Sequence, residues 1–327
     1  MGPSAAWETR YLPAVRKLTD RIRITAVFDS IAARAQQVAR ECGADVVYGI
    51  CSLVNRRDVD AVLFLDAGWH GMEALRILCA GNKPIYIAAE IGNDITALRA
   101  CHWTAVSYGL TLMPELGWRY TPATGRLQEL MATRLGRARK LCVDAALHLP
   151  KTCETSESET EKRYLASLLD WSRYLIRTAP ARIDCKHLNP NGNGEPVHQI
   201  RVTFEPPRSE KHAPIAEFRF HHQENQTSAQ SEAYMRYQIE CESGTAVIDS
   251  SNAISWKTDS QPIEESLTTD RDEVEVMLDH FCRRVVGGLV PVADLADIYR
   301  GIHLLQAVEE SDRTGKTVSV ERDPLIP

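Results

Sequence analysis

The chain has 327 residues, of which 44% are hydrophobic and 25% charged, and its formal net charge is −6. This composition is ordinary for a folded globular protein, and the length favours two domains over one. The acidic balance argues against a nucleic-acid-binding protein, and no apolar run approaches the roughly 20 residues of a membrane span.

The cysteines and the start of the chain bear on its compartment. The nine cysteines are scattered singly, which is typical of free thiols in a reducing cytoplasm rather than of a disulfide framework. The first residues lack the basic and apolar regions of a signal peptide, so we expect a cytoplasmic protein. His, Cys and carboxylate residues nowhere show the spacing of a zinc site, so no metal is predicted.

The first part of the chain, residues 1–121, alternates predicted helices and strands. In chain order these are a helix over 10–18, a strand over 22–28, a helix over 31–41, a strand over 46–48, a helix over 52–56, a strand over 59–65, a helix over 69–80, a strand over 84–89, a helix over 95–108 and a strand over 110–113. Short apolar strands that alternate with helices predict an α/β, Rossmann-like domain with a doubly wound parallel sheet.

Candidate chemistry follows from where these strands end. Ligands of open parallel sheets bind at the carboxyl ends of the strands. The residues at or just after those ends are Asp29, Asp66, Trp69, His70 and Glu90. We therefore expect these side chains to face a ligand.

One element of the expected sheet has no counterpart in these residues. A dinucleotide-binding fold begins with a strand that leads into a glycine-rich turn, whereas here Gly2 and Ser4 come with no strand before them. A sheet without its first strand would leave buried backbone groups unpaired, at about 1–3 kcal/mol each. The simpler interpretation is a start placed too far downstream; the alternative is a replaced strand.

The second part, residues 122–327, has a different pattern. It predicts helices over 123–135, 162–176, 272–286 and 292–312, and strands over 137–147, 182–186, 198–204, 215–222, 233–242, 245–249, 253–257 and 317–320. Strands in succession, flanked by helices, predict an α+β domain with an open antiparallel sheet.

The order of elements and several stretches resemble the Gfo/Idh/MocA family of NAD(P)-dependent oxidoreductases. These stretches are RYLPAV over 10–15, ITAVFD over 24–29, VDAVLF over 59–64, GNKPIYIAAE over 81–90, WRYTPATGRLQELMATRLG over 118–136 and GIHLLQAVEESDRTGKTVSV over 301–320. The resemblance implies a sugar- or polyol-like substrate and a homo-oligomer formed through the second domain's sheet. It also implies an NAD cofactor, held by Gly2 and Ser4 at the glycine turn and by Asp29 at a ribose hydroxyl.

The catalytic positions depart from the family pattern. By alignment, the family's catalytic lysine falls on Ala89, and its aspartate and histidine fall on Arg163 and Ser167. A methyl group cannot polarise or protonate a reacting oxygen as an ammonium group does. The sequence therefore predicts either an oxidoreductase with a rearranged or degenerate site, a ligand-binding protein that has lost hydride transfer, or an oligomerisation partner for an active relative.

The remaining candidates each have a structural alternative. The candidate catalytic residues are Tyr120, Glu90 and His70, and the candidate substrate-binding residues are Arg119, Ser167 and Asp170. His70 and Glu90 could instead begin or cap helices, Asp29 could cap a turn, and Arg119 with Tyr120 could pack at a joint between domains.

Overall fold

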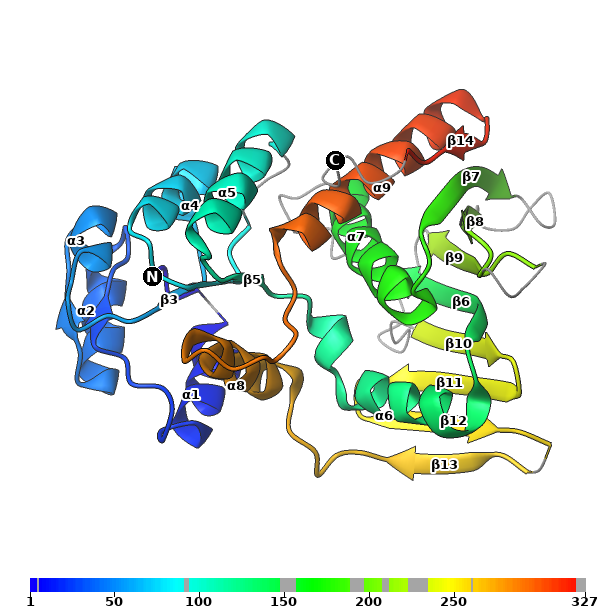
Figure 1. Cartoon of the computed structure of the whole chain (residues 1–327), viewed down its shortest axis with the longest axis horizontal. Helices are drawn as coiled ribbons and strands as arrows, with labels where there is room; N and C mark the ends of the chain where they lie inside the picture. The colour runs from blue at the N-terminus through cyan, green and yellow to red at the C-terminus, as the bar shows by residue number, and fades with distance from the viewer. Residues whose placement is uncertain are drawn as a thin grey trace, which may run out of the picture. The chain divides into compact units, whose positions relative to one another are not determined.

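The structure is a computed structural model that describes residues 1–4, 6–90, 94–147, 157–188, 197–207, 212–222, 235–259 and 261–321 (Figure 1). The chain forms two compact units, one of Met1–Tyr120 with Arg271–Tyr299, the other of Thr121–Asp270 with Arg300–Pro327. The first boundary lies one residue from the predicted one. The segment Arg271–Tyr299 differs from the prediction, because it folds with the first unit.

The first unit has the predicted alternation of helices and parallel strands. Its elements are η1 (Trp7–Tyr11), α1 (Leu12–Lys17), β1 (Ala26–Val27), α2 (Ala32–Cys42), β2 (Asp45–Val46), α3 (Ile50–Val54), β3 (Val62–Phe64), η2 (Gly68–His70), α4 (Gly71–Ala80), β4 (Ile85–Ile87), α5 (Ile95–Tyr108), β5 (Leu112–Pro114), η3 (Gly117–Tyr120) and α8 (Glu273–Val285). All strand pairs in this unit are parallel, which confirms the α/β class.

The parallel strands fall into two separate sheets, β1-β2 and β3-β4-β5. Between β1 and β3 the described residues form no further strand, and a cavity of about 1340 Å³ lies there, lined by residues that include Ala26, Val62 and Phe281. The first residues bridge the two sheets at one end only. The Gly2 N–H donates to the Phe28 carbonyl at 2.8 Å, and the Leu65 N–H donates to the Met1 carbonyl at 3.0 Å.

Helix α8 completes the core of the first unit. Asp272 caps its start by accepting a hydrogen bond from the Glu275 N–H at 2.8 Å. Val274, Met277, Leu278 and Phe281 then repeat at helical spacing and are buried in the same cluster as Trp7 and Tyr11. The helical spacing of these four apolar residues can be recognised in the sequence, but the surface that they cover cannot.

The second unit is built on one nine-stranded sheet with the order β13-β12-β11-β10-β6-β9-β8-β7-β14. These strands are β6 (Ala138–Leu147), β7 (Pro180–Leu188), β8 (Val197–Phe204), β9 (Ile215–His222), β10 (Met235–Cys241), β11 (Gly244–Ser250), β12 (Ala253–Lys257), β13 (Ile263–Ser266) and β14 (Val318–Ser319). Every pair is antiparallel except β6 and β9, so the sheet is mixed rather than purely antiparallel. Strand β13 was not predicted.

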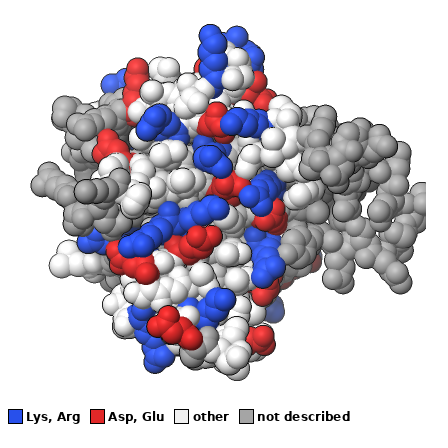
Figure 2. All heavy atoms as spheres, turned by 90° about the vertical axis from the view of Figure 1, so that its right-hand side faces the viewer, with Lys and Arg blue, Asp and Glu red and all other residues white. Residues whose placement is uncertain are grey.

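Three helices, α6 (Pro122–Leu130), α7 (Glu157–Ile176) and α9 (Leu295–Thr314), lie on one face of this sheet (Figure 1). A short π-helical turn, η4 (Met131–Leu135), continues α6. Figure 2 shows the side of the molecule that carries the sheet, with basic and acidic side chains interspersed. Among the described residues, no helix has the length and apolarity to cross a bilayer, and every described cysteine is a free thiol.

Candidate functional site

A cavity of about 460 Å³ lies in the first unit, at the carboxyl ends of β1 and β2. Three of the predicted cofactor and catalytic residues line it, namely Asp29, Trp69 and His70. Tyr48 lines it as well, a residue that the sequence reasoning missed. The remaining lining is mostly apolar, so the cavity combines one carboxylate with aromatic and aliphatic walls.

Asp29 is held at this cavity by two contacts of its own carboxylate. One oxygen accepts a hydrogen bond from the Ile31 N–H at 2.7 Å, and the other lies 3.4 Å from the guanidinium of Arg34. The Asp29 residue is only 7% exposed. The predicted turn cap is therefore present, and it fixes the carboxylate rather than excluding it from the cavity. Arg34 was also missed, although it stands in the first turn of the helix that follows Asp29.

The aromatic wall comes from η2 and from the loop after β2. The rings of Trp69 and His70 stack with centroids 3.7 Å apart, and His70 lies 6.4 Å from the ring of Phe28. Trp69 is 80% exposed and Tyr48 is 82% exposed. These exposed rings form a rim of the cavity on which a flat aromatic ligand could stack.

Gly2, Ser4 and Asp66 form a tight corner beside the bridge between the two sheets. Gly2 has a φ of 62°, and a Cβ added to it would lie 2.1 Å from the Asp66 carbonyl oxygen, so only glycine fits. The Ser4 hydroxyl accepts a hydrogen bond from the Ala6 N–H at 3.2 Å, at the start of the first helical segment. The Asp66 carboxylate accepts one from the Gly68 N–H at 2.8 Å. Both polar side chains thus order local backbone.

The end of β4 carries Ala89 and Glu90. The amides of Ala88 and Ala89 both donate to the Phe64 carbonyl, at 2.9 and 3.0 Å, which fixes this turn against β3. Glu90 is exposed. The cap of α5 is Asp94, whose carboxylate accepts from the Ala97 N–H at 3.0 Å, so the alternative role of Glu90 as that cap is wrong.

Arg119 and Tyr120 are both engaged inside the first unit. The Arg119 guanidinium makes a two-point ion pair with Asp297, at 3.1 and 3.0 Å, and both side chains are largely buried. The ring of Tyr120 meets that of His280 edge to face, with centroids 5.7 Å apart. Neither residue lines the cavity at Asp29.

The other predicted substrate residues belong to the second unit, on α7. Asp170 is buried, and its carboxylate lies 3.7 Å from the Arg173 guanidinium. Ser167 is half-buried, and the side chain of Arg163 lies outside the described residues. Asp29, in contrast, belongs to the first unit.

A second polar cluster, also missed from the sequence, follows the end of β5. One Glu115 carboxylate oxygen accepts hydrogen bonds from the hydroxyls of Tyr11 and Tyr86, at 2.7 and 2.8 Å, and the other pairs with Arg10 at 2.9 Å. Burial, reinforced by the Glu115 charge, raises the pKa of both tyrosines well above their usual range. These hydroxyls therefore stay protonated donors, which favours a structural role for the cluster.

Comparison with known proteins identifies the fold. No family model matches the chain, and no curated protein matches it. Among solved structures, it is similar to an NAD-binding oxidoreductase from Klebsiella pneumoniae, with 14% identity, a TM-score of 0.75, and coverage of 96% of this chain and 95% of that one. UDP-N-acetylglucosamine 3-dehydrogenase from Acidithiobacillus ferrooxidans has 16% identity, a TM-score of 0.73 and 95% coverage of both chains. Levoglucosan dehydrogenase, solved with NADH and L-sorbose, has 13% identity, a TM-score of 0.72 and 94% coverage of both chains.

Proposed function

We propose that the chain is an NAD-linked oxidoreductase of the Gfo/Idh/MocA type, acting on a sugar- or polyol-like substrate. The fold similarity over almost the whole chain, to proteins described as dehydrogenases of sugar-like molecules, supports the class. The observation that carries the proposal in this chain is the cavity at the ends of β1 and β2, where a buried carboxylate meets exposed aromatic rings.

The residues at this cavity fit the adenosine half of a dinucleotide. The Asp29 carboxylate would accept hydrogen bonds from the ribose hydroxyls, and Trp69 or Tyr48 would stack on the adenine ring. When bound, the nicotinamide cofactor supplies the hydride acceptor. Arg34 lies 3.4 Å from Asp29 and so weakens the repulsion that Asp29 would exert on a 2′-phosphate. We still expect NAD to bind more tightly than NADP. The Asp29 carboxylate is buried and fixed at its turn, whereas the Arg34 side chain is exposed, so the negative charge of Asp29 dominates at the ribose.

Proton handling would differ from the family pattern. Ala89 has only a methyl group, and it is buried in the turn after β4, so the end of β4 offers no ammonium group at that position. We propose that Glu90 or His70, both near strand ends, or Tyr120 takes over proton transfer. If none of them does, the protein binds the cofactor and a ligand without turnover.

Titration with NADH tests the proposal directly. Trp69 is exposed at the cavity, so its fluorescence should change as the cofactor binds, and Asp29→Ala should weaken NADH binding by about 10- to 100-fold through the lost charged hydrogen bonds. Trp69→Phe should abolish most of the signal. Trp103→Phe is the matched control, since Trp103 is 43% exposed on α5 and does not line the cavity. A flat response of the wild type at millimolar NADH would overturn the proposal.

Selectivity and turnover are separate measurements. Arg34→Ala should increase the preference for NAD over NADP, whereas tighter binding of NADP by the wild type would contradict our assignment of Asp29. A panel of sugars and polyols, followed by NADH formation, then distinguishes an enzyme from a binding protein. In a binding protein, NADH binds but no substrate is turned over. The double variant Ala89→Lys with Ser167→His then tests whether the family's residues restore turnover.

We also propose a homo-oligomer formed through the nine-stranded sheet. Away from the helices, the sheet carries a charged cluster in which Glu217, almost fully buried, accepts a hydrogen bond from Gln199 at 2.7 Å and pairs with Arg201 at 3.3 Å. Charged pairs of both signs suit a self-complementary interface. Light scattering after size-exclusion chromatography should give a multiple of 36.6 kDa, and Arg201→Glu should shift the mass towards that of one chain.

A further inference from the structure

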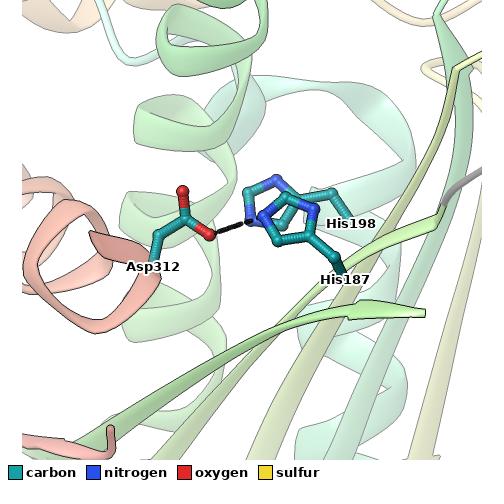
Figure 3. Close-up of side chains that lie close together, drawn as sticks. All are labelled: His187, His198 and Asp312. Carbon is teal, nitrogen blue, oxygen red and sulfur yellow. Dashed lines mark hydrogen bonds and ion pairs between the residues drawn. The ribbon is translucent and has the colours of Figure 1, made fainter. Parts of the chain in front are cut away.

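A separate cluster of metal-ligating side chains lies in the second unit, on the strand pair β7–β8 and the helix α9. It consists of His187, His198 and Asp312, whose candidate ligand atoms all lie within 4.8 Å of one another. Figure 3 shows the two imidazole rings side by side, with the Asp312 carboxylate directed at them from α9. None of these residues belongs to the proposed cofactor site, which lies in the first unit.

The register of the sheet explains why the two histidines meet. His187 and His198 are direct partners across the antiparallel β7–β8 pair, so their side chains leave the same face at neighbouring positions. Their rings stack with centroids 4.7 Å apart and planes inclined by only 6°. Alternation along β7 places His187 on the face of Ile183 and Cys185, both of which are buried.

The third ligand comes from the last turn of α9, which is fixed on the same face. The Cys185 N–H donates to the Ser311 hydroxyl at 3.0 Å, and this hydroxyl in turn donates to the Lys316 carbonyl at 2.8 Å. The neighbouring Asp312 thus projects one carboxylate oxygen towards the Nε2 edges of the two rings (Figure 3). That oxygen lies 2.8 Å from Nε2 of His187 and 3.6 Å from Nε2 of His198.

We propose that His187, His198 and Asp312 bind a divalent transition-metal ion of the Zn²⁺ class. Two imidazole nitrogens and one carboxylate oxygen form a ligand set typical of zinc, whereas Ca²⁺ and Mg²⁺ prefer sites made of oxygen alone. In a tetrahedral site with metal–ligand distances near 2.0–2.1 Å, ligand atoms stand about 3.4 Å apart. The two rings are nearly parallel, so metal binding requires them to rotate out of their stack until both nitrogens face one ion.

Exposure determines how the ion would enter and what it would do. His198 is mostly buried, with a side chain 12% exposed, whereas His187 is 62% and Asp312 38% exposed. The ion therefore approaches from solvent and keeps its fourth position for water or an external ligand. Its three protein ligands connect β7, β8 and α9, so bound metal ties the C-terminal helix to the sheet.

Metal titration of the full-length protein, freed of metal by a chelator, tests the site without any cofactor. Added Co²⁺ should produce the visible absorption of a tetrahedral site with one ion per chain, and Zn²⁺ should displace it. His187→Gln, His198→Gln and Asp312→Asn should each weaken binding by about tenfold or more.

His221→Gln is the matched control. His221 lies on the same sheet, and its Nε2 is 3.5 Å from the Asp144 carboxylate, but among the described side chains it belongs to no cluster of three metal-ligating residues. Its loss should leave metal binding within about twofold of the wild type. Two results would overturn the proposal: no absorption change with excess Co²⁺, or binding that survives in all three site variants. Because His187 is the most exposed ligand, His187→Gln should fold normally, which circular dichroism verifies.

Discussion

Replacement of Glu115 by alanine should destabilise the first unit strongly, although the residue lies outside the proposed cofactor cavity. The carboxylate accepts hydrogen bonds from two phenols, of which Tyr86 is fully buried and Tyr11 is 3% exposed. Without it, the Tyr86 hydroxyl keeps, among the residues that the structure describes, only a weak contact to the Met277 sulfur at 3.8 Å.

The magnitude follows from counting what Glu115→Ala leaves unpaired. Each buried hydroxyl without its acceptor costs about 1–3 kcal/mol, which gives about 2–6 kcal/mol for the two tyrosines. Arg10 adds little, because it is 40% exposed and retains Glu273 at 3.5 Å. Such a loss is a large part of the roughly 5–15 kcal/mol that stabilises a typical domain.

Urea denaturation would measure the loss in the free energy of unfolding. Hydrogen exchange with mass spectrometry would then assign this loss to peptides of the first unit. Glu73→Ala is the control, since Glu73 makes an exposed pair with Arg76 at 3.1 Å and should cost less than about 0.5 kcal/mol. In a Tyr86→Phe background, Glu115→Ala should lower the free energy of unfolding by less than it does in the wild type. One of the two hydroxyls that Glu115→Ala leaves without an acceptor is then already absent. A cost for Glu115→Ala no larger than that of the control would refute this reasoning.

Three further changes probe the first unit. Gly2→Ala should lower the melting temperature more than Gly43→Ala does. Both glycines have positive φ, but of the two only Gly2 would bring its new Cβ against a neighbour, the Asp66 carbonyl. Equal shifts would mean that the backbone around Gly2 relaxes freely. Asp279→Asn should cost about 1–3 kcal/mol in urea denaturation, because the fully buried carboxylate pairs with three arginines that water can partly resolvate, and a neutral result would contradict this electrostatic role. The raised pKa of Tyr86 keeps the phenol protonated in the folded protein, whereas it ionises above about pH 10 in the unfolded chain. The free energy of unfolding should therefore fall by up to about 1.4 kcal/mol per pH unit there. Tyr86→Phe should make this fall measurably shallower between about pH 9 and pH 11.

Local signals made some elements fully predictable. Helix α5 was predicted over 95–108, and the structure has Ile95–Tyr108, because Asp94 caps its start and Gly109, with a φ of 62°, ends it. The strand over 253–257 was predicted with the same success. Long-range information was not accessible in this way: the apolar stripe of α8 shows that one face is buried, but the stripe does not say which unit buries it.

The same contrast holds for the candidate sites. Asp29, Trp69 and His70 could be found from sequence because the rule that ligands bind at strand ends needs only local order. Arg34 and Tyr48 share the cavity, but the sequence offered no comparable rule for them. The cluster of His187, His198 and Asp312 escaped because its residues are distant in the chain, and only strand register and helix docking bring them together.

The bridge between the two parallel sheets has a dynamic consequence. Strand β4 has neighbours on both sides, whereas β1 pairs with β2 alone, and the only backbone ties described between β1 and β3 run through Met1 and Gly2. Isolated two-stranded pairs are marginal in water. The amide protons of Ala26 and Val27 should therefore exchange with deuterium long before those of Ile85–Ile87, through local opening of the two-stranded sheet.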